Sequence, residues 1–107
     1  MARPIVSHFA EAMEQKLKEN DYKGGWSGCT PSWLLRRLRA EINELARALK
    51  HHKRTPALIA REAADVANFA MMIADVTGGL ADEIRRRTAD PSATGPGTPA
   101  SATPKES

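Results

Sequence analysis

The chain has 107 residues, a formal net charge of +3, one cysteine and a low aromatic content of 5%. This length suits one small domain, and so mild a positive charge suits an anionic ligand without indicating nucleic acid by itself. One cysteine excludes an internal disulfide and a cysteine-rich zinc site. No apolar run approaches the roughly 20 residues that cross a bilayer, and the first residues do not form a secretory signal. We therefore expect a cytoplasmic protein without a membrane partner.

Helix signals begin near the start of the chain. Over residues 4–20, Phe9, Met13 and Leu17 recur every four positions and form a narrow apolar stripe on a first helix. A Gly-rich loop with two aromatic residues and a lysine follows. The sequence then predicts a second helix over residues 31–50.

Two Thr-Pro pairs mark the starts of the central helices. Thr30-Pro31 and Thr55-Pro56 each read as an N-cap followed by proline at the first helical position. The third helix runs over residues 56–76, and the Gly-Gly pair that follows is a typical helix stop. A short fourth helix is expected over residues 80–88.

The end of the chain has a different composition. Residues 90–107 are rich in Pro, Gly, Ser, Thr and Ala and contain no large apolar residue, so they cannot bury enough surface to offset the entropy of ordering. We predict an all-α domain over residues 1–89 and a disordered tail over residues 90–107. Three substantial helices do not complete a four-helix bundle, so we expect the domain to assemble as a homo-oligomer, at least a dimer.

Acidic residues fall on helix faces that the apolar pattern turns inward. At about 100° per residue, Glu41 borders the apolar arc of the second helix, and Glu44 lies further round the same edge. In the third helix, Glu62 falls inside the apolar arc. Asp65, three residues later, lies between Met72 and Leu58 on a helix that is apolar nearly all round.

A buried carboxylate must be protonated, paired with a cation or bound to a metal. If the two helix faces meet, four carboxylates converge, and their mutual repulsion calls for a cation. Oxygen-only ligands favour magnesium, manganese or calcium over zinc. Salt bridges are the alternative, because Arg37 lies one turn before Glu41 and Arg61 is next to Glu62.

The two acid pairs read Glu41-Ile42-Asn43-Glu44 and Glu62-Ala63-Ala64-Asp65. This pattern resembles the metal motif of the MazG-like, all-α nucleoside triphosphate pyrophosphohydrolases. The flanking blocks ENDYKGGW, PSWLLRRL and ADVANFAMMIAD are similar to phage-encoded and prophage-encoded members. Many relatives carry a further Glu before the first pair, where this chain has Ala40.

The resemblance implies a MazG-like helical bundle, assembled as a dimer or tetramer, that acts in the host cytoplasm if it is phage-encoded. It implies hydrolysis of a (deoxy)nucleoside triphosphate to the monophosphate and pyrophosphate, with a purine such as dGTP favoured. The cofactor would be Mg²⁺, with Mn²⁺ as substitute, and the acids would act by holding a metal that activates water. The expected metal ligands are Glu41, Glu44, Glu62 and Asp65.

Three further residues are candidates for binding the substrate. Lys23 in the Gly-rich loop would meet the triphosphate, and Trp26 would stack on the base unless it plugs the core. Asn68, one turn after Asp65, would bind a phosphate oxygen or orient a ligand carboxylate. Its amide would otherwise satisfy a neighbouring helix.

Two other classes of function stay open at this point. The segment LLRRLR over residues 34–39 and the arginines at 85–87 fit a small helical nucleic-acid-binding or regulatory protein without catalysis. Such a protein would bind DNA in a salt-sensitive way without metal. A purely structural helical interaction protein is the third class. The enzyme hypothesis expects no nucleic-acid partner.

Overall fold

The computed structural model describes residues 2–89, which form four α-helices, one 3-10 helix and no strand. The predicted all-α class is confirmed for these residues, and each expected helix boundary agrees within one residue. The predicted tail, residues 90–107, lies outside the described part. The helices are α1 (Pro4–Glu19), η1 (Asp21–Lys23), α2 (Pro31–Lys50), α3 (Pro56–Val76) and α4 (Gly79–Ala89).

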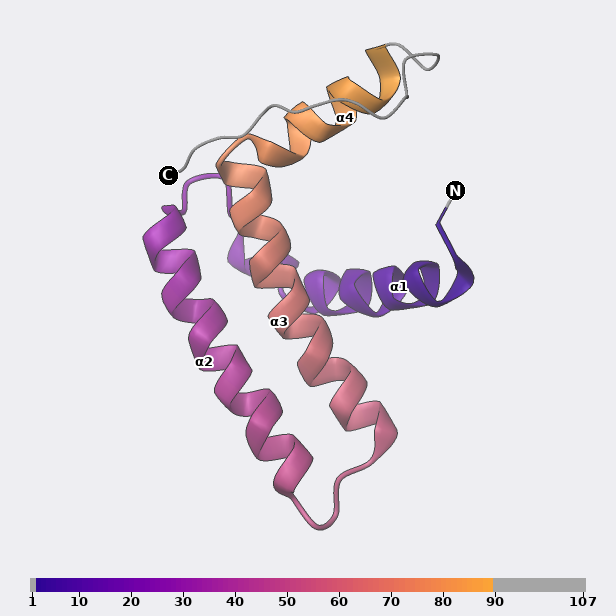
Figure 1. The fold of residues 1–107 in the computed structure, drawn as a ribbon. Coiled ribbons are helices and arrows are strands. Elements are labelled where there is room, and N and C mark those ends of the chain that lie inside the picture. Colours follow the sequence, from indigo (N-terminus) through magenta and orange to yellow (C-terminus); the bar gives the residue numbers. More distant parts are fainter. Residues whose placement is uncertain (1, 90–107) are drawn as a thin grey trace.

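Helices α2 and α3 form an antiparallel pair joined by a short loop (Figure 1). Both begin as the sequence predicts. The Thr30 hydroxyl accepts a hydrogen bond from the Trp33 backbone N–H at 3.1 Å, and the Thr55 hydroxyl accepts one from the Leu58 N–H at 3.1 Å. These caps satisfy donors that a helix start leaves unpaired. The pairing sets the inward faces of the two longest helices against each other.

Helix α1 crosses α3 near its middle, at a steep angle to the α2–α3 pair (Figure 1). Polar contacts between α1 and α3 stabilise this crossing. The Asn68 side-chain amide donates to the Met13 carbonyl at 3.0 Å, and Arg61 pairs with Glu19 through two hydrogen bonds of 2.9 and 3.0 Å. Helix α4 turns away from α3 after Gly78, whose φ of 87° is the left-handed conformation that favours glycine.

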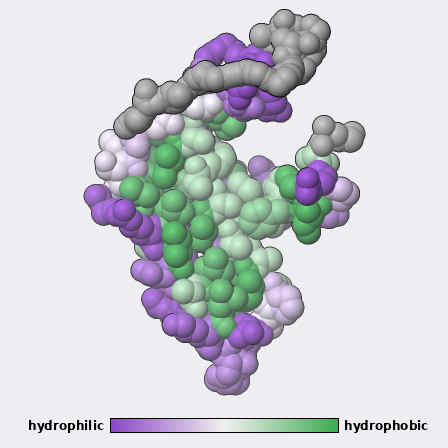
Figure 2. Space-filling model, in the orientation of Figure 1, coloured by the Kyte–Doolittle hydropathy of each residue, from purple (hydrophilic) through white to green (hydrophobic). Residues whose placement is uncertain are grey.

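The core of the described chain is thin. Its buried apolar residues are Leu34, Ala48 and Ala64, and Leu34 is the one large side chain among them. Hydrophobic residues also gather on the outer face of the α2–α3 pair (Figure 2). Large apolar side chains are exposed at Ile5, Val6, Tyr22, Trp33, Leu35, Ile42, Leu49, Leu58 and Ile84. Within residues 2–89, no helix is both long and apolar enough to cross a membrane.

Candidate metal centre

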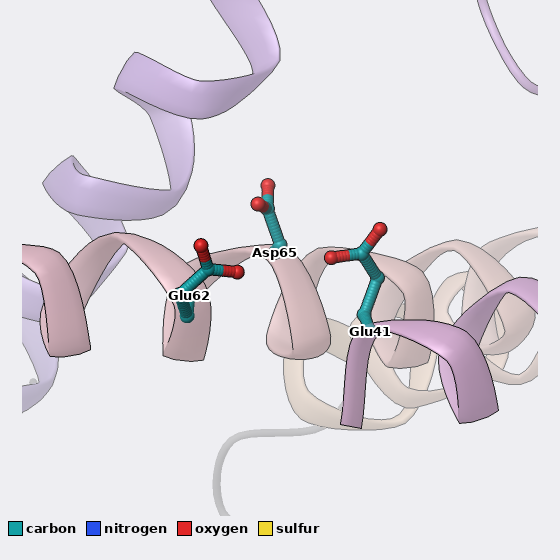
Figure 3. Close-up of side chains that lie close together, drawn as sticks. All are labelled: Glu41, Glu62 and Asp65. Carbon is teal, nitrogen blue, oxygen red and sulfur yellow. The ribbon is translucent and has the colours of Figure 1, made fainter. Parts of the chain in front are cut away.

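Three carboxylates from two helices meet where α2 and α3 pack together (Figure 3). Glu41 comes from α2, and Glu62 and Asp65 come from α3. One oxygen of each lies within 4.8 Å of the others, and all three side chains are half-buried. The spacing of three residues puts Glu62 and Asp65 one turn apart on the same face of α3. The antiparallel pairing then brings Glu41 opposite them. We call these three residues the carboxylate cluster.

The structure does not bring Glu44 into the carboxylate cluster. Its side chain is exposed, and its carboxylate pairs with Arg47 on the same helix at 3.7 Å. Its negative charge is still near enough to contribute to the raised pKa of Glu41. Glu44 therefore lies at the rim of the cluster, one turn along α2 from Glu41.

The pKa of the Glu41 carboxyl is raised above its ordinary value of 4.5. Burial is the main cause, and the charges of Asp65, Glu62 and Glu44 act in the same direction, against the Arg37 guanidinium. Like charges gathered in a partly desolvated place disfavour the ionised form. An added cation would therefore reduce the electrostatic repulsion among these carboxylates.

Two cations from different helices, Arg37 on α2 and Lys16 on α1, contact the carboxylate cluster. The Arg37 guanidinium lies 3.1 Å from the Glu41 carboxylate, and the Lys16 ammonium lies 3.3 Å from that of Asp65. Glu62 has no ion-pair partner among the described residues, because Arg61 turns to Glu19 instead. The salt-bridge alternative thus applies to Glu41 and not to Glu62.

Lys16 was not singled out from the sequence, although a signal for it exists. It lies one turn after Met13 and next to Leu17, beside the apolar stripe of α1. A lysine at the edge of such a stripe can lay its alkyl stem along the neighbouring helix. The stripe does not specify which residue of the neighbouring helix Lys16 contacts.

A cavity of about 510 Å³ opens beside the carboxylate cluster. Its walls come from α1, the Gly-rich loop, α2 and α3, and they carry both charges. Glu41 and Asp65 supply the acidic part, and the three predicted substrate residues Lys23, Trp26 and Asn68 all line it. The other lining residues are Lys16, Leu17, Asn20, Gly24, Gly25, Cys29, Trp33, Leu34, Arg37, Phe69 and Met72.

Trp26 is held by a long-range hydrogen bond. Its indole N–H donates to a carboxylate oxygen of Asp75 at 2.9 Å, which ties the Gly-rich loop to the end of α3. The ring is half-buried and lines the cavity, so it is neither a core plug nor a free surface residue. Gly24 adopts a φ of 92° in the same loop, a conformation that a residue with a Cβ rarely takes.

Asp75→Ala is expected to shift the conformational equilibrium of Trp26 about fivefold away from its anchored position. An exposed hydrogen bond to a charged acceptor stabilises its geometry by about 1 kcal/mol, which corresponds to that factor. Asp75→Asn keeps an acceptor oxygen and should show a smaller effect. Tryptophan fluorescence in a Trp33→Phe background should shift to the red for Asp75→Ala alone. Identical spectra for Asp75→Ala and the parent protein would exclude the anchoring role.

Asn68 is almost entirely buried, with 4% of its surface exposed. Its amide N–H group donates to the Met13 carbonyl, so the expectation that it satisfies a neighbouring helix holds for the nitrogen. Its side-chain oxygen is buried and has no hydrogen-bond partner within the described chain. Since buried acceptors are normally satisfied, this oxygen is a place where a donor is missing.

The raised pKa of Glu41 predicts how stability without metal depends on pH. The folded protein binds the Glu41 proton more tightly than the unfolded chain, whose ordinary value is 4.5. The resulting stabilisation of the folded state is fully present below pH 4.5 and is lost as the pH rises through the higher pKa of the folded protein. At neutral pH the ionised Glu41 carboxylate therefore destabilises the folded protein.

Glu41→Gln is therefore expected to raise the melting temperature of the chelator-treated protein at pH 7 by a few degrees. Near pH 4 the two proteins should melt alike, because Glu41 is then protonated in both states. Thermal denaturation in EDTA across this range provides the comparison. A lower melting temperature for the variant at pH 7 would contradict the prediction.

Comparison of the chain with protein-family models, curated proteins and solved structures gave no match. The chemistry of the site is therefore argued from the chain's own residues. A set of carboxylates at the edge of a cavity lined by cations can hold a divalent ion and place it beside a bound anion.

Proposed function

We propose that this chain is a MazG-like nucleoside triphosphate pyrophosphohydrolase. It would hold Mg²⁺, or Mn²⁺ as substitute, and hydrolyse a (deoxy)nucleoside triphosphate to the monophosphate and pyrophosphate. The observation that carries the proposal is the convergence of Glu41, Glu62 and Asp65 within 4.8 Å beside the cavity. Glu44, one turn from Glu41, is the proposed fourth ligand, reached by a change of its side-chain rotamer.

The residues present suit magnesium. All donors are carboxylate oxygens, and oxygens on opposite sides of an octahedral magnesium ion lie about 4.2 Å apart. The 4.8 Å spread of the carboxylate cluster needs only small side-chain movements to reach this geometry. The chemistry that magnesium supplies when bound at such a site is neutralisation of phosphate charge and activation of water for attack on phosphorus.

The cavity suits a polyphosphate with a base attached. Its volume of about 510 Å³ is within the usual range for small-molecule sites. Lys16, Lys23 and Arg37 line it and would balance phosphate charge. Trp26 offers an aromatic face on which a nucleobase can stack. Such stacking contributes about 1–3 kcal/mol to binding, and a larger ring system stacks more strongly. A purine such as dGTP is the favoured substrate.

Incubation of the protein with Mg²⁺ and each common NTP and dNTP, followed by separation of products, tests this function. We expect a nucleoside monophosphate and pyrophosphate from at least one nucleotide, and no product in EDTA. A diphosphate and phosphate would place cleavage at a different bond. No product from any nucleotide would refute the proposal.

The nucleic-acid-binding alternative rests on two basic segments, and ion pairs involve arginines of both. Arg85 pairs with Asp82, and Arg86 and Arg87 both pair with Glu83, so two carboxylates offset part of the charge of the three arginines on α4. Arg37 from the other basic segment is paired with Glu41. A gel shift with duplex DNA at low salt, with and without chelator, separates the two functions. The enzyme proposal expects no shift in either lane.

We also propose that a second copy of the chain packs on the outer face of α2. Leu35, Ile42 and Leu49 are spaced by seven residues and are 40%, 47% and 47% exposed. With Leu38 and Leu45 between them, they repeat the alternating three- and four-residue spacing by which helices pair through a hydrophobic seam. The thin core of the single chain supports the same assembly.

A further inference from the structure

Lys16 on α1 contacts the carboxylate cluster from a different helix than Arg37, which lies on α2. Its ammonium lies 3.3 Å from one oxygen of Asp65 and 3.6 Å from Glu19. The side chain is 15% exposed, whereas Lys18 two residues later is an exposed residue. A lysine that gives up so much water needs a nearby anion. Glu19 is already bonded through both oxygens to Arg61, so Asp65 is the main partner of Lys16.

We propose that Lys16 is a tethered cation that competes with the metal for Asp65 and is transferred into the cavity when the metal binds. This inference rests on the proposed function, because it takes the carboxylate cluster as the metal centre. An ammonium and a divalent ion on one carboxylate repel each other strongly at such short range. Metal binding therefore weakens the contact between Lys16 and Asp65, and that contact lowers the affinity for metal.

The structure offers the displaced ammonium a place to go. Asn68 lies one turn after Asp65 on α3, and its buried side-chain oxygen has no hydrogen-bond partner in the described chain. Its nitrogen is bonded to the Met13 carbonyl, one turn before Lys16 on α1. Asn68 and Lys16 therefore come from the turns at which α3 and α1 meet, and both line the same cavity.

The consequence is a coupling between metal and anion. With the metal on Asp65, the positive charge of Lys16 faces the cavity rather than the carboxylate cluster, and an anionic ligand gains a contact there. Binding of metal and of anion then reinforce each other, as reciprocity of linked equilibria requires. Lys16 would act as an anion contact and as a brake on metal binding in the absence of ligand.

Titration of Mn²⁺ alone into the wild type and Lys16→Met, by calorimetry at neutral pH, tests the competition. We expect Lys16→Met to bind Mn²⁺ roughly two- to fivefold more tightly, the range for loss of one close charge contact. Lys18→Met makes the same charge change on the exposed side of α1 and should stay near the wild-type value. Lys16→Arg keeps the cation and should also stay near it.

Inorganic pyrophosphate, titrated at saturating Mn²⁺, tests the transfer. Lys16→Met should bind it several-fold more weakly, while Lys18→Met and Lys16→Arg bind it nearly as the wild type does. A damaged fold would weaken both ligands, so the opposite signs for Mn²⁺ and pyrophosphate distinguish the proposal from misfolding.

Thermal denaturation adds a check on stability. Lys16→Met should melt below the wild type in EDTA, and the difference should narrow at saturating Mn²⁺, because tighter metal binding compensates for the lost ion pair. Equal or weaker Mn²⁺ binding by Lys16→Met would overturn the competition, and unchanged pyrophosphate binding would overturn the transfer. Failure of the wild type to bind Mn²⁺ would instead overturn the metal centre itself and this inference with it.

Discussion

Replacement of Asp65 by Asn is expected to slow the proposed hydrolysis of nucleoside triphosphates by about a hundredfold or more. Asp65 is central to the carboxylate cluster: it lies within 4.8 Å of Glu41 and Glu62, and it is the partner of Lys16. The amide keeps the size of the side chain but removes the charge that holds a divalent cation. Rate measurements with Mg²⁺ and the preferred nucleotide give the comparison.

The same substitution should remove stabilisation by metal. Mg²⁺ raises the melting temperature of a protein that binds it only when folded, by mass action. The wild type should show this rise, and Asp65→Asn and Glu62→Gln should not. In EDTA, Glu62→Gln should be at least as stable as the wild type, since Glu62 has no ion-pair partner in the described residues and is repelled by its neighbours.

Glu14→Gln is the matched control, because Glu14 is exposed on α1 and belongs to no cluster of carboxylates described here. It should keep both activity and the response to Mg²⁺. Full activity in Asp65→Asn would show that the catalytic metal, if one is used, is held elsewhere.

Ile42→Lys is expected to prevent the proposed self-association through α2 and to lower the melting temperature sharply. Ile42 is the central member of the exposed seam on α2, between Leu35 and Leu49. A stable interface between proteins usually buries about 800 Å² on each partner, with its centre free of unpaired charge. A lysine at the centre would bring an ammonium into that apolar contact, and the thin core leaves the separated chain little stability of its own.

Gel filtration with light scattering measures this directly. The wild type should run as a dimer or larger and Ile42→Lys as a monomer or an unfolded chain. Asn43→Lys is the matched control, since it adds the same charge at the next, exposed position outside the seam. A monomeric wild type at micromolar concentration, or an unchanged mass for Ile42→Lys, would contradict the proposed assembly.

The helices of this chain could be predicted closely because their starts and stops are local. The two Thr-Pro caps and the glycines after α3 act through hydrogen bonds and backbone angles within a few residues. The pairing of α2 with α3 follows from the short loop between them. Spacing within each helix then predicts which carboxylates share a face, and Glu41, Glu62 and Asp65 meet as that spacing suggests.

Contacts that depend on how α1 crosses α3 could not be predicted in the same way. Arg61 neighbours Glu62 in sequence, yet the crossing offers it Glu19 from α1. Lys16 meets Asp65 for the same reason, and Trp26 reaches Asp75 because the loop folds back over α3. Helical periodicity specifies the direction of a side chain around its own axis and does not specify the angle or register of another helix.

Glu44 shows the limit of a motif. The Glu-x-x-Glu spacing places it one turn from Glu41, but that turn carries it toward the exposed edge of α2, where Arg47 is within 3.7 Å. A long side chain at the exposed edge of a helix can pair with any of several neighbouring charges. The residue spacing of the motif does not specify which of these charges it pairs with.

The carboxylate cluster is most directly tested by locating a metal in a crystal. Crystals of the protein grown with Mn²⁺ should show an anomalous peak between the side chains of Glu41, Glu62 and Asp65, with oxygen ligands at about 2.2 Å. Crystals of Asp65→Asn grown alike should lack the peak. A manganese ion bound at other residues, with these three carboxylates uncoordinated, would contradict the account.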